Sequence, residues 1–211
     1  MQIEHFIVGS VQTNCYFIIQ DRTKELIVVD PGASGGRLAE LAKQKGYEPV
    51  VILLTHGHFD HCEGIEDFRE AFPDRDIEVI VHEEEKRVLE DPELNLSDSL
   101  GSGSETYHAD RFVKDHEKLS IAGFDIEVLL TPGHTPGGCC YYFPGEKAVF
   151  CGDTLFAGSV GRTDFPEGSM RQLIRSVKEQ LFVLPEDTRV FPGHEGTTTI
   201  GDEKRYNFFV Q

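Results

Sequence analysis

Basic residues are scarce in this sequence: 20 lysines and arginines stand against 37 aspartates and glutamates, which gives a formal net charge of −17. Phosphate backbones and anionic lipid headgroups repel such a chain, so we expect neither nucleic acid nor a membrane surface as a partner. No stretch approaches the roughly 18 apolar residues of a membrane span, and the first residues lack the basic and apolar segments of a secretory leader. These absences predict a cytoplasmic protein.

A disulfide framework is missing too, because the cysteines are odd in number and their spacing shows no pairing. We expect reduced thiols at all five positions: Cys15, Cys62, Cys139, Cys140 and Cys151. With 211 residues, of which 39% are hydrophobic, the chain is long enough for one well-packed domain and short for two. We therefore expect a single domain over residues 1–211.

Helical and strand periodicities are interspersed along the chain, which indicates an α+β fold. The expected strands cover residues 3–8, 15–19, 26–29, 50–54, 79–81, 126–130, 140–143, 148–151 and 189–191. The expected helices cover residues 36–45, 62–71, 83–89 and 169–181. The first three strands are spaced as antiparallel hairpins. Two halves of this kind suggest two sheets packed face to face with helices outside.

Two polar segments interrupt this pattern. The segment 91–111 is small and polar, with Gly101-Ser102-Gly103-Ser104 in its middle, and it is the best candidate for a loop or lid. The three consecutive glutamates Glu83–Glu85 predict a solvated helix face.

Histidines and aspartates gather directly after apolar runs, at His56, His58, Asp60, His61, His134, Asp153 and His194. Imidazole and carboxylate are ligands of borderline divalent metals. Burying so many imidazoles without a cation would leave polar groups unpaired, at about 1–3 kcal/mol each. The cluster therefore predicts a metal site, and seven ligands suffice for two metals. The isolated histidines are expected at surface or packing positions: His5, His82, His108 and His116.

The motif Thr55-His56-Gly57-His58-Phe59-Asp60-His61, followed in order by His134, Asp153 and His194, resembles the metallo-β-lactamase superfamily. Within it, the segments Gly152-Asp153-Thr154-Leu155-Phe156 and Gly161-Arg162-Thr163-Asp164-Phe165-Pro166 are similar to the short glyoxalase II-like hydrolases. The resemblance implies an αββα sandwich, in which two mixed β-sheets are flanked by helices and the metals lie at one edge of the sheets. The C-terminal helical domain that contributes glutathione contacts in two-domain members is not expected here.

The resemblance also implies how the ligands divide. His56, His58 and His134 would hold the first metal, and Asp153 would bridge to the second, which the remaining three would hold: Asp60, His61 and His194. Asp60 and Asp153 are the expected catalytic residues, with a general-base role for Asp60 as the alternative to a ligand role. Zinc is the expected metal, and iron and manganese are the alternatives, because the same side chains accept all three. Arg162 is expected either to bind the substrate or to pair with Asp164.

The function implied is that of a dinuclear metal-dependent hydrolase of hydroxyacylglutathione thioesters such as S-lactoylglutathione. A metal-bridging hydroxide would attack the acyl carbon of this small anionic thioester. One alternative is a mononuclear-iron persulfide dioxygenase, suggested by Gly161–Phe165, whose ligands would be His56, His134 and Asp153. Another is a lactonase with the same centre. The oligomeric state is open.

Overall fold

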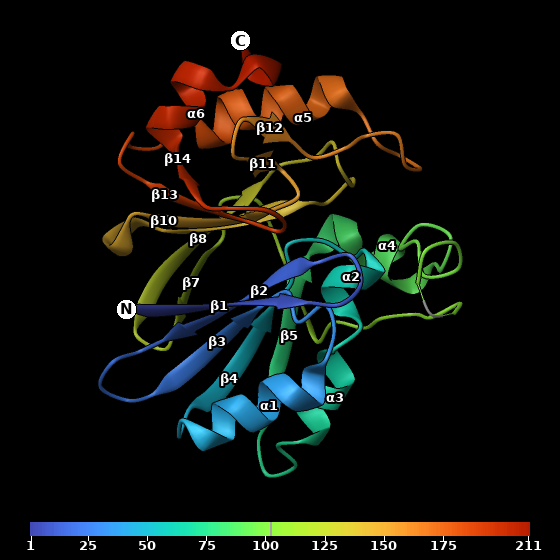
Figure 1. The fold of residues 1–211 in the computed structure, drawn as a ribbon, viewed down its shortest axis with the longest axis vertical. Helices are drawn as coiled ribbons and strands as arrows, with labels where there is room; N and C mark the ends of the chain where they lie inside the picture. The colour runs from blue at the N-terminus through green and yellow to red at the C-terminus, as the bar shows by residue number, and fades with distance from the viewer. Residues whose placement is uncertain (102) are drawn as a thin grey trace.

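Two six-stranded sheets pack face to face in the computed structural model, which describes residues 1–101 and 103–211 (Figure 1). The first sheet is formed in spatial order by β1 (Gln2–Val8), β2 (Thr13–Ile19), β3 (Glu25–Val29), β4 (Glu48–Leu53), β5 (Glu78–His82) and β6 (Arg111–Val113). Strands β1 to β3 pair antiparallel and β3 to β6 pair parallel, so the sheet is mixed. The expected N-terminal hairpins are confirmed.

The second sheet is formed in spatial order by β14 (Thr198–Thr199), β13 (Arg189–Pro192), β10 (Ala148–Gly152), β9 (Cys139–Phe143), β8 (Phe124–Leu130) and β7 (Lys118–Ile121). Only the β10–β13 pair is parallel within this sheet. A separate hairpin joins β11 (Leu155–Phe156) to β12 (Ser159–Val160).

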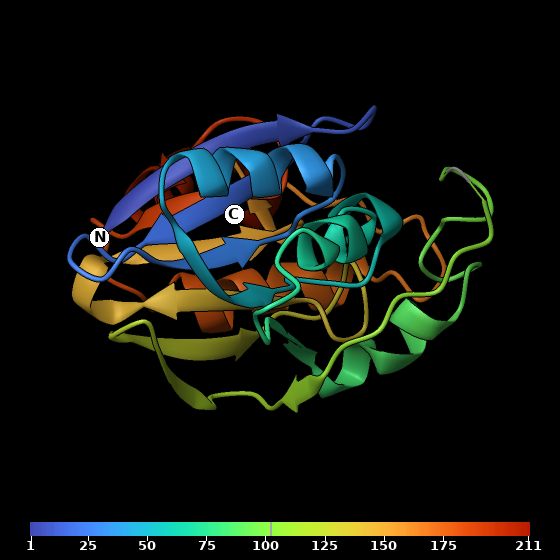
Figure 2. The same ribbon diagram turned by 90° about the horizontal axis from the view of Figure 1, so that it is seen from below.

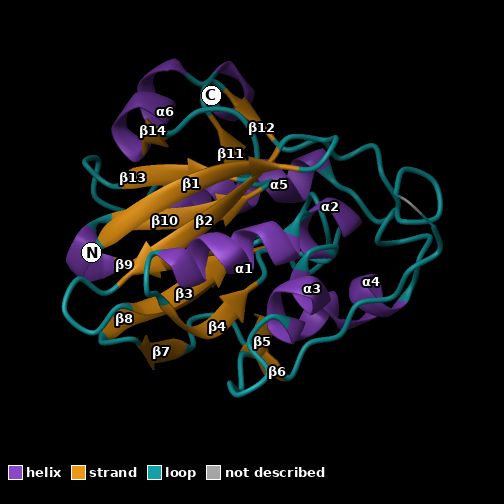
Figure 3. Cartoon of the chain, turned by 60° about the horizontal axis from the view of Figure 1, so that its bottom comes forward, coloured by secondary structure: helices purple, strands orange, loops and turns teal. Residues whose placement is uncertain are grey.

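Helices cover the outer faces of both sheets (Figures 1 and 3). The α-helices are α1 (Gly35–Gln44), α2 (Phe59–Cys62), α3 (Ile65–Glu70), α4 (Lys86–Glu90), α5 (Met170–Ser176) and α6 (Ile200–Tyr206). Three 3-10 helices are η1 (Glu83–Glu85), η2 (Pro144–Glu146) and η4 (Phe208–Val210). A π-helix, η3 (Val177–Leu181), continues α5. Within the described ranges, no helix has the length and apolarity needed to cross a membrane.

Three apolar clusters hold the four layers together. Side chains such as Tyr141 and Phe150 fill the space between the sheets. Phe17 and Phe68 pack in the cluster beneath α1 and α3, and Leu173 packs in the one beneath α5. The αββα sandwich is thus confirmed, and the five cysteines are free and buried.

The expected helix over residues 62–71 is wrong in one respect, since the chain forms two short helices, α2 and α3. The Gly64 amide between them donates to the carbonyl oxygen of Pro31 at 2.8 Å. A Cβ on Gly64 would lie 2.5 Å from the same oxygen, so the chain here lies directly against the loop after β3. This tertiary contact interrupts the helix.

The prediction for Glu83–Glu85 is wrong for its last residue. Glu83 and Glu84 are exposed, but Glu85 is fully buried. The segment 91–111 has no regular structure at its described positions up to β6 and extends beyond the sheets next to α4 (green in Figure 2). Ser102, in the middle of the proposed lid, lies outside the described residues.

Candidate metal centre

The predicted ligands come from five places in the chain and meet at one edge of the two sheets. His56 and His58 follow β4, Asp60 and His61 lie in α2, and His134 lies between β8 and β9. Asp153 follows β10 and His194 follows β13. Glycines permit the convergence: a Cβ on Gly193 would lie 2.3 Å from Asp153 Oδ1.

A cluster of three buried imidazoles forms the first half of the centre. His58 Nδ1 lies 3.1 Å from His56 Nε2 and 2.9 Å from His134 Nε2. Burial, together with the neighbouring imidazoles, holds the pKa of His56 and His58 well below the usual value. The rings are therefore neutral, which is the protonation state that binds a metal ion.

Asp60, His61 and His194 form the second half. Asp60 Oδ2 lies 3.6 Å from His61 Nε2 and 3.3 Å from His194 Nε2. Burial alone would lower the pKa of His61, but the nearby carboxylates, Asp60 and Asp30 foremost, raise it to about 10. The carboxylates thus favour positive charge at this point, which a divalent cation would supply in place of the proton.

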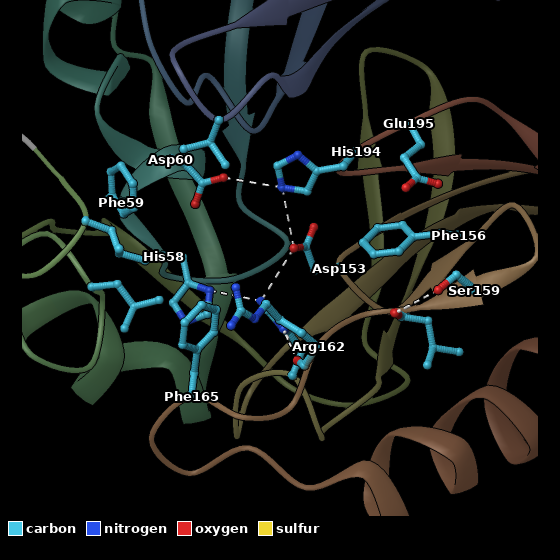
Figure 4. Close-up of a pocket in the computed structure, with 15 residues that line it drawn as sticks. His58, Phe59, Asp60, Asp153, Phe156, Ser159, Arg162, Phe165, His194 and Glu195 are labelled. Atoms are coloured by element: carbon cyan, nitrogen blue, oxygen red, sulfur yellow. Dashed lines mark hydrogen bonds and ion pairs between the residues drawn. The ribbon is translucent and has the colours of Figure 1, made fainter. Parts of the chain in front are cut away.

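Asp153 lies between the two halves (Figure 4). Its Oδ1 is 3.5 Å from His61 Nε2, and its Oδ2 is 3.5 Å from both His134 Nε2 and His194 Nε2. One carboxylate therefore contacts imidazoles of both halves, which is the position of a bridging ligand.

The donor set fits divalent metal ions. Within the described part of the chain, His61 Nε2 and Asp153 Oδ1 are buried and have no hydrogen-bond partner. Orphaned buried polar atoms are costly, and here two of them face each other across 3.5 Å. Three overlapping groups of potential ligand atoms each fit within 4.8 Å: His56/His58/His134, His56/His61/Asp153 and Asp60/His61/His194.

Hydrogen bonds behind the imidazoles determine which nitrogen faces the centre. Three rings donate from Nδ1 and so present Nε2: His56 to Thr55 Oγ1 at 3.2 Å, His61 to Asp30 Oδ2 at 2.9 Å and His134 to the Arg162 carbonyl oxygen at 2.6 Å. Such outer contacts fix the tautomer and the ring orientation of a metal ligand.

Asp30 contacts the candidate centre through His61, and the sequence analysis missed it. It is buried directly after β3 and also accepts from the Thr55 amide at 2.8 Å and the Thr55 hydroxyl at 2.6 Å. Like Asp153, it directly follows an apolar strand, and this position was the signal that could have identified it. The sequence Asp30-Pro31-Gly32, however, resembles an ordinary turn.

A cavity of about 360 Å³ adjoins the metal-ligand side chains. Its apolar lining residues are Val11, Phe59, Leu96, Leu100, Phe156, Val160 and Phe165. The Phe165 ring lies edge-on to His58, with centroids 5.6 Å apart (Figure 4). Leu96 and Leu100 belong to the segment 91–111, so this loop forms part of the cavity wall.

Arg162 also lines the cavity, where it makes the pairing considered as the alternative to substrate binding. Its Nε and Nη2 donate to the two carboxylate oxygens of Asp164, each at 2.7 Å, and its guanidinium lies 4.1 Å from the centre of the Phe165 ring. The side chain is 59% exposed. Asp164 thus orients Arg162 at the cavity, and contact with substrate stays a prediction.

The remaining histidines occupy surface or packing positions, as expected. His5 bonds to Asn14 Oδ1 at 2.6 Å and stacks on Tyr16. His82 is buried at the end of β5, and His108 and His116 are exposed.

Comparisons with known proteins identify relatives that share this fold. The family model for the Metallo-beta-lactamase superfamily matches residues 8–194. A Bacillus subtilis (strain 168) protein named probable metallo-hydrolase YqgX is 40% identical over 96% of this chain and 94% of its own length. The hydroxyacylglutathione hydrolase GloC of Haemophilus influenzae is 35% identical over 100% of this chain and 98% of its own length.

Solved structures share the fold over nearly the whole chain. The B3 metallo-beta-lactamase BLEG-1 superposes with a TM-score of 0.93 at 38% identity, covering 100% of both chains. TTHA1623, described in a di-iron-bound form, superposes with a TM-score of 0.84 at 32% identity, covering 98% of this chain and 99% of its own.

Proposed function

Because the chain belongs to the metallo-β-lactamase superfamily, we propose that it is a dinuclear metal-dependent hydrolase of hydroxyacylglutathione-type thioesters. The observation that carries the proposal is the position of Asp153, whose two carboxylate oxygens lie 3.5 Å from imidazoles of both halves of the centre. The single-metal alternative, with His56, His134 and Asp153, would not require Asp153 to lie against His61 and His194 as well.

We assign the ligands to the two ions as the resemblance implies. His56, His58 and His134 would hold one ion, Asp153 would join it to a second, and the latter would be held by Asp60, His61 and His194. When bound, the two ions would activate a water molecule as the nucleophile and polarise the thioester carbonyl.

The residues of the chain itself supply position, charge and shielding from water. The hydroxyl of Thr13 donates to Asp60 Oδ2 at 2.7 Å and orients this carboxylate, which faces the cavity as a ligand and as a candidate proton acceptor. Phe59 and Phe165 give the cavity apolar walls, which exclude water from the acyl group. The departing thiolate is a good leaving group, so no general acid is required.

The substrate class rests on the GloC relative and on Arg162. A relative named hydroxyacylglutathione hydrolase supports a thioester substrate. Arg162 is exposed at the cavity and would bind an anionic part of a small thioester. Zinc is the proposed metal, with iron or manganese as alternatives, and the di-iron form of TTHA1623 supports iron in this fold.

The proposal is tested with purified protein, S-lactoylglutathione and matched variants. We expect thioester hydrolysis that is abolished by a chelator, restored by zinc, and lost in Asp153→Ala but kept in Asp187→Ala, an exposed carboxylate paired with Lys147 on the surface. Undiminished turnover in metal-free protein would sink the proposal. One iron per chain with substrate-dependent oxygen uptake would instead favour the dioxygenase, and turnover of lactones alone would favour a lactonase.

The compartment and the domain organisation follow as lesser parts of the same proposal. The five free, buried cysteines suit a reducing compartment such as the cytoplasm. The three apolar clusters of the sandwich suit a single domain over residues 1–211.

A further inference from the structure

Glu85 is a buried carboxylate that connects two of the loops bearing metal ligands. Its Oε2 accepts from the Gly57 amide and its Oε1 from the Gly137 amide, each at 2.8 Å. Gly57 stands between His56 and His58. Gly137 belongs to the loop between β8 and β9, three residues after His134.

The two loops come from different sheets. The loop with Gly57 follows β4 of the first sheet, and the loop with Gly137 leads into β9 of the second. Glu85 lies on η1, directly after β5, so its side chain spans the junction between the sheets at the point where His56, His58 and His134 converge.

The two glycines lie very close to Glu85. A Cβ on Gly57 would lie 3.1 Å from Glu85 Oε2, and a Cβ on Gly137 would lie 2.5 Å from the Glu85 backbone nitrogen. The loop with Gly137 therefore presses its backbone directly against η1, where a side chain has no room, and the loop with Gly57 lies close against the Glu85 carboxylate and α4. In the described part of the chain Glu85 forms no salt bridge, and its carboxyl group is held by the amides of Gly57 and Gly137.

We propose that Glu85 is a positioning residue that sets the distance between the two loops, so that the three imidazoles of the first half converge on one metal ion. The inference rests on the proposed metal centre and deepens it, because it assigns part of the affinity for the first ion to a residue that touches none of its ligands. Outer contacts that hold ligands in place contribute about 10–100-fold to metal affinity in other sites.

The test compares Glu85→Gln with a matched substitution of a second buried carboxylate, Glu203→Gln. Glu203 lies on α6 and accepts from the Gly158 amide at 2.9 Å and from the Thr198 hydroxyl at 2.7 Å, away from the first three imidazoles. In each variant, one carboxylate oxygen becomes an NH₂ group that cannot accept a hydrogen bond. Both should lower the melting temperature of the metal-free protein, whereas only Glu85→Gln should weaken the first metal site.

Zn²⁺ affinity is measured by competition with a chromophoric chelator, and ligand geometry by the visible spectrum of the Co²⁺-loaded protein. We expect at least a tenfold weaker first site and an altered Co²⁺ spectrum for Glu85→Gln, and wild-type values for Glu203→Gln. If Glu85→Gln does not fold, Glu85→Asp, which is one methylene shorter and cannot reach both loops, replaces it with the same expectation.

Equal zinc affinities in wild type and folded Glu85 variants, or equal losses in both buried-carboxylate variants, would overturn the role of Glu85. A wild-type protein that binds no metal at all would overturn the proposed function instead. The two failures are therefore distinguishable.

Discussion

The substitution Asp30→Asn should weaken the second metal site and leave the first. In the native protein Asp30 Oδ1 accepts from the Thr55 amide at 2.8 Å, and Oδ2 accepts from His61 Nδ1 at 2.9 Å. In the asparagine variant the amide oxygen must stay opposite the Thr55 N–H, because an NH₂ group there would face another donor. The new NH₂ group then points at both His61 Nδ1 and the Thr55 hydroxyl, and its two hydrogens can serve one each.

This placement reverses the tautomer of His61. Nδ1 must now accept a hydrogen bond, so the proton moves to Nε2, the atom that lies 3.5 Å from Asp153 Oδ1 and faces the centre. A protonated Nε2 cannot bind a metal ion. We expect the second site to weaken by about 10–100-fold, or roughly 1.4–2.7 kcal/mol. Losing the charge-assisted bond should also lower the free energy of unfolding by about 1.5–3 kcal/mol.

The assay is titration calorimetry of the metal-free protein with Zn²⁺, with metal content after gel filtration as a second reading. The wild type should bind two ions, and Asp30→Asn should retain one tightly, because none of the three imidazoles of the first half bonds to Asp30 directly; His56 is linked to it only through the Thr55 hydroxyl. Asp125→Asn, an exposed substitution on β8, is the control and should bind like the wild type. Two ions bound to Asp30→Asn with unchanged affinities would refute the tautomer argument.

Two further predictions concern the cavity and the stability of the fold. Arg162→Ala should raise the KM for S-lactoylglutathione by about tenfold with little change in kcat, because the substitution removes a charge contact with the substrate worth about 1.4 kcal/mol. An unchanged KM would mean that Arg162 pairs with Asp164 and does not bind the substrate. Burial raises the pKa of Glu4, but hydrogen bonds from Lys45 and Tyr47 outweigh burial and hold this pKa below 4.5. The ionised Glu4 therefore stabilises the fold above pH 4.5, and this contribution is lost as the pH falls through the lowered pKa. Urea unfolding of Glu4→Gln should therefore lose stability at pH 7 and converge with the wild type in acid; a constant difference at every pH would contradict this.

The residues that meet at the candidate centre could be predicted because each stands where the local sequence already carries the signal. His134, Asp153 and His194 lie close behind β8, β10 and β13 with glycine beside them. Strands that end at one edge bring such positions together without any knowledge of distant contacts. The apolar runs that mark these strands also gave the two-sheet architecture.

Asp30 carried a local signal and was missed, whereas two other features, the burial of Glu85 and the break between α2 and α3, depend on contacts that no local pattern contains. The burial of Glu85 is determined by Gly57 and Gly137, which lie 28 and 52 residues away in the sequence. The helix break at Gly64 depends on the hydrogen bond from its amide to the carbonyl oxygen of Pro31, which precedes β4 in the sequence. Two-residue strands such as β11 and β14 are too short to show a period.

The central claim is that two metal ions joined by Asp153 perform the hydrolysis. The most direct measurement titrates metal-free protein with Zn²⁺ and records the rate of S-lactoylglutathione hydrolysis and the bound metal in the same samples. We predict a rate that continues to rise until two equivalents are bound, and almost no hydrolysis at any zinc loading of Asp153→Ala. A rate that reaches its maximum at one equivalent, or that is present before any zinc is added, would contradict it.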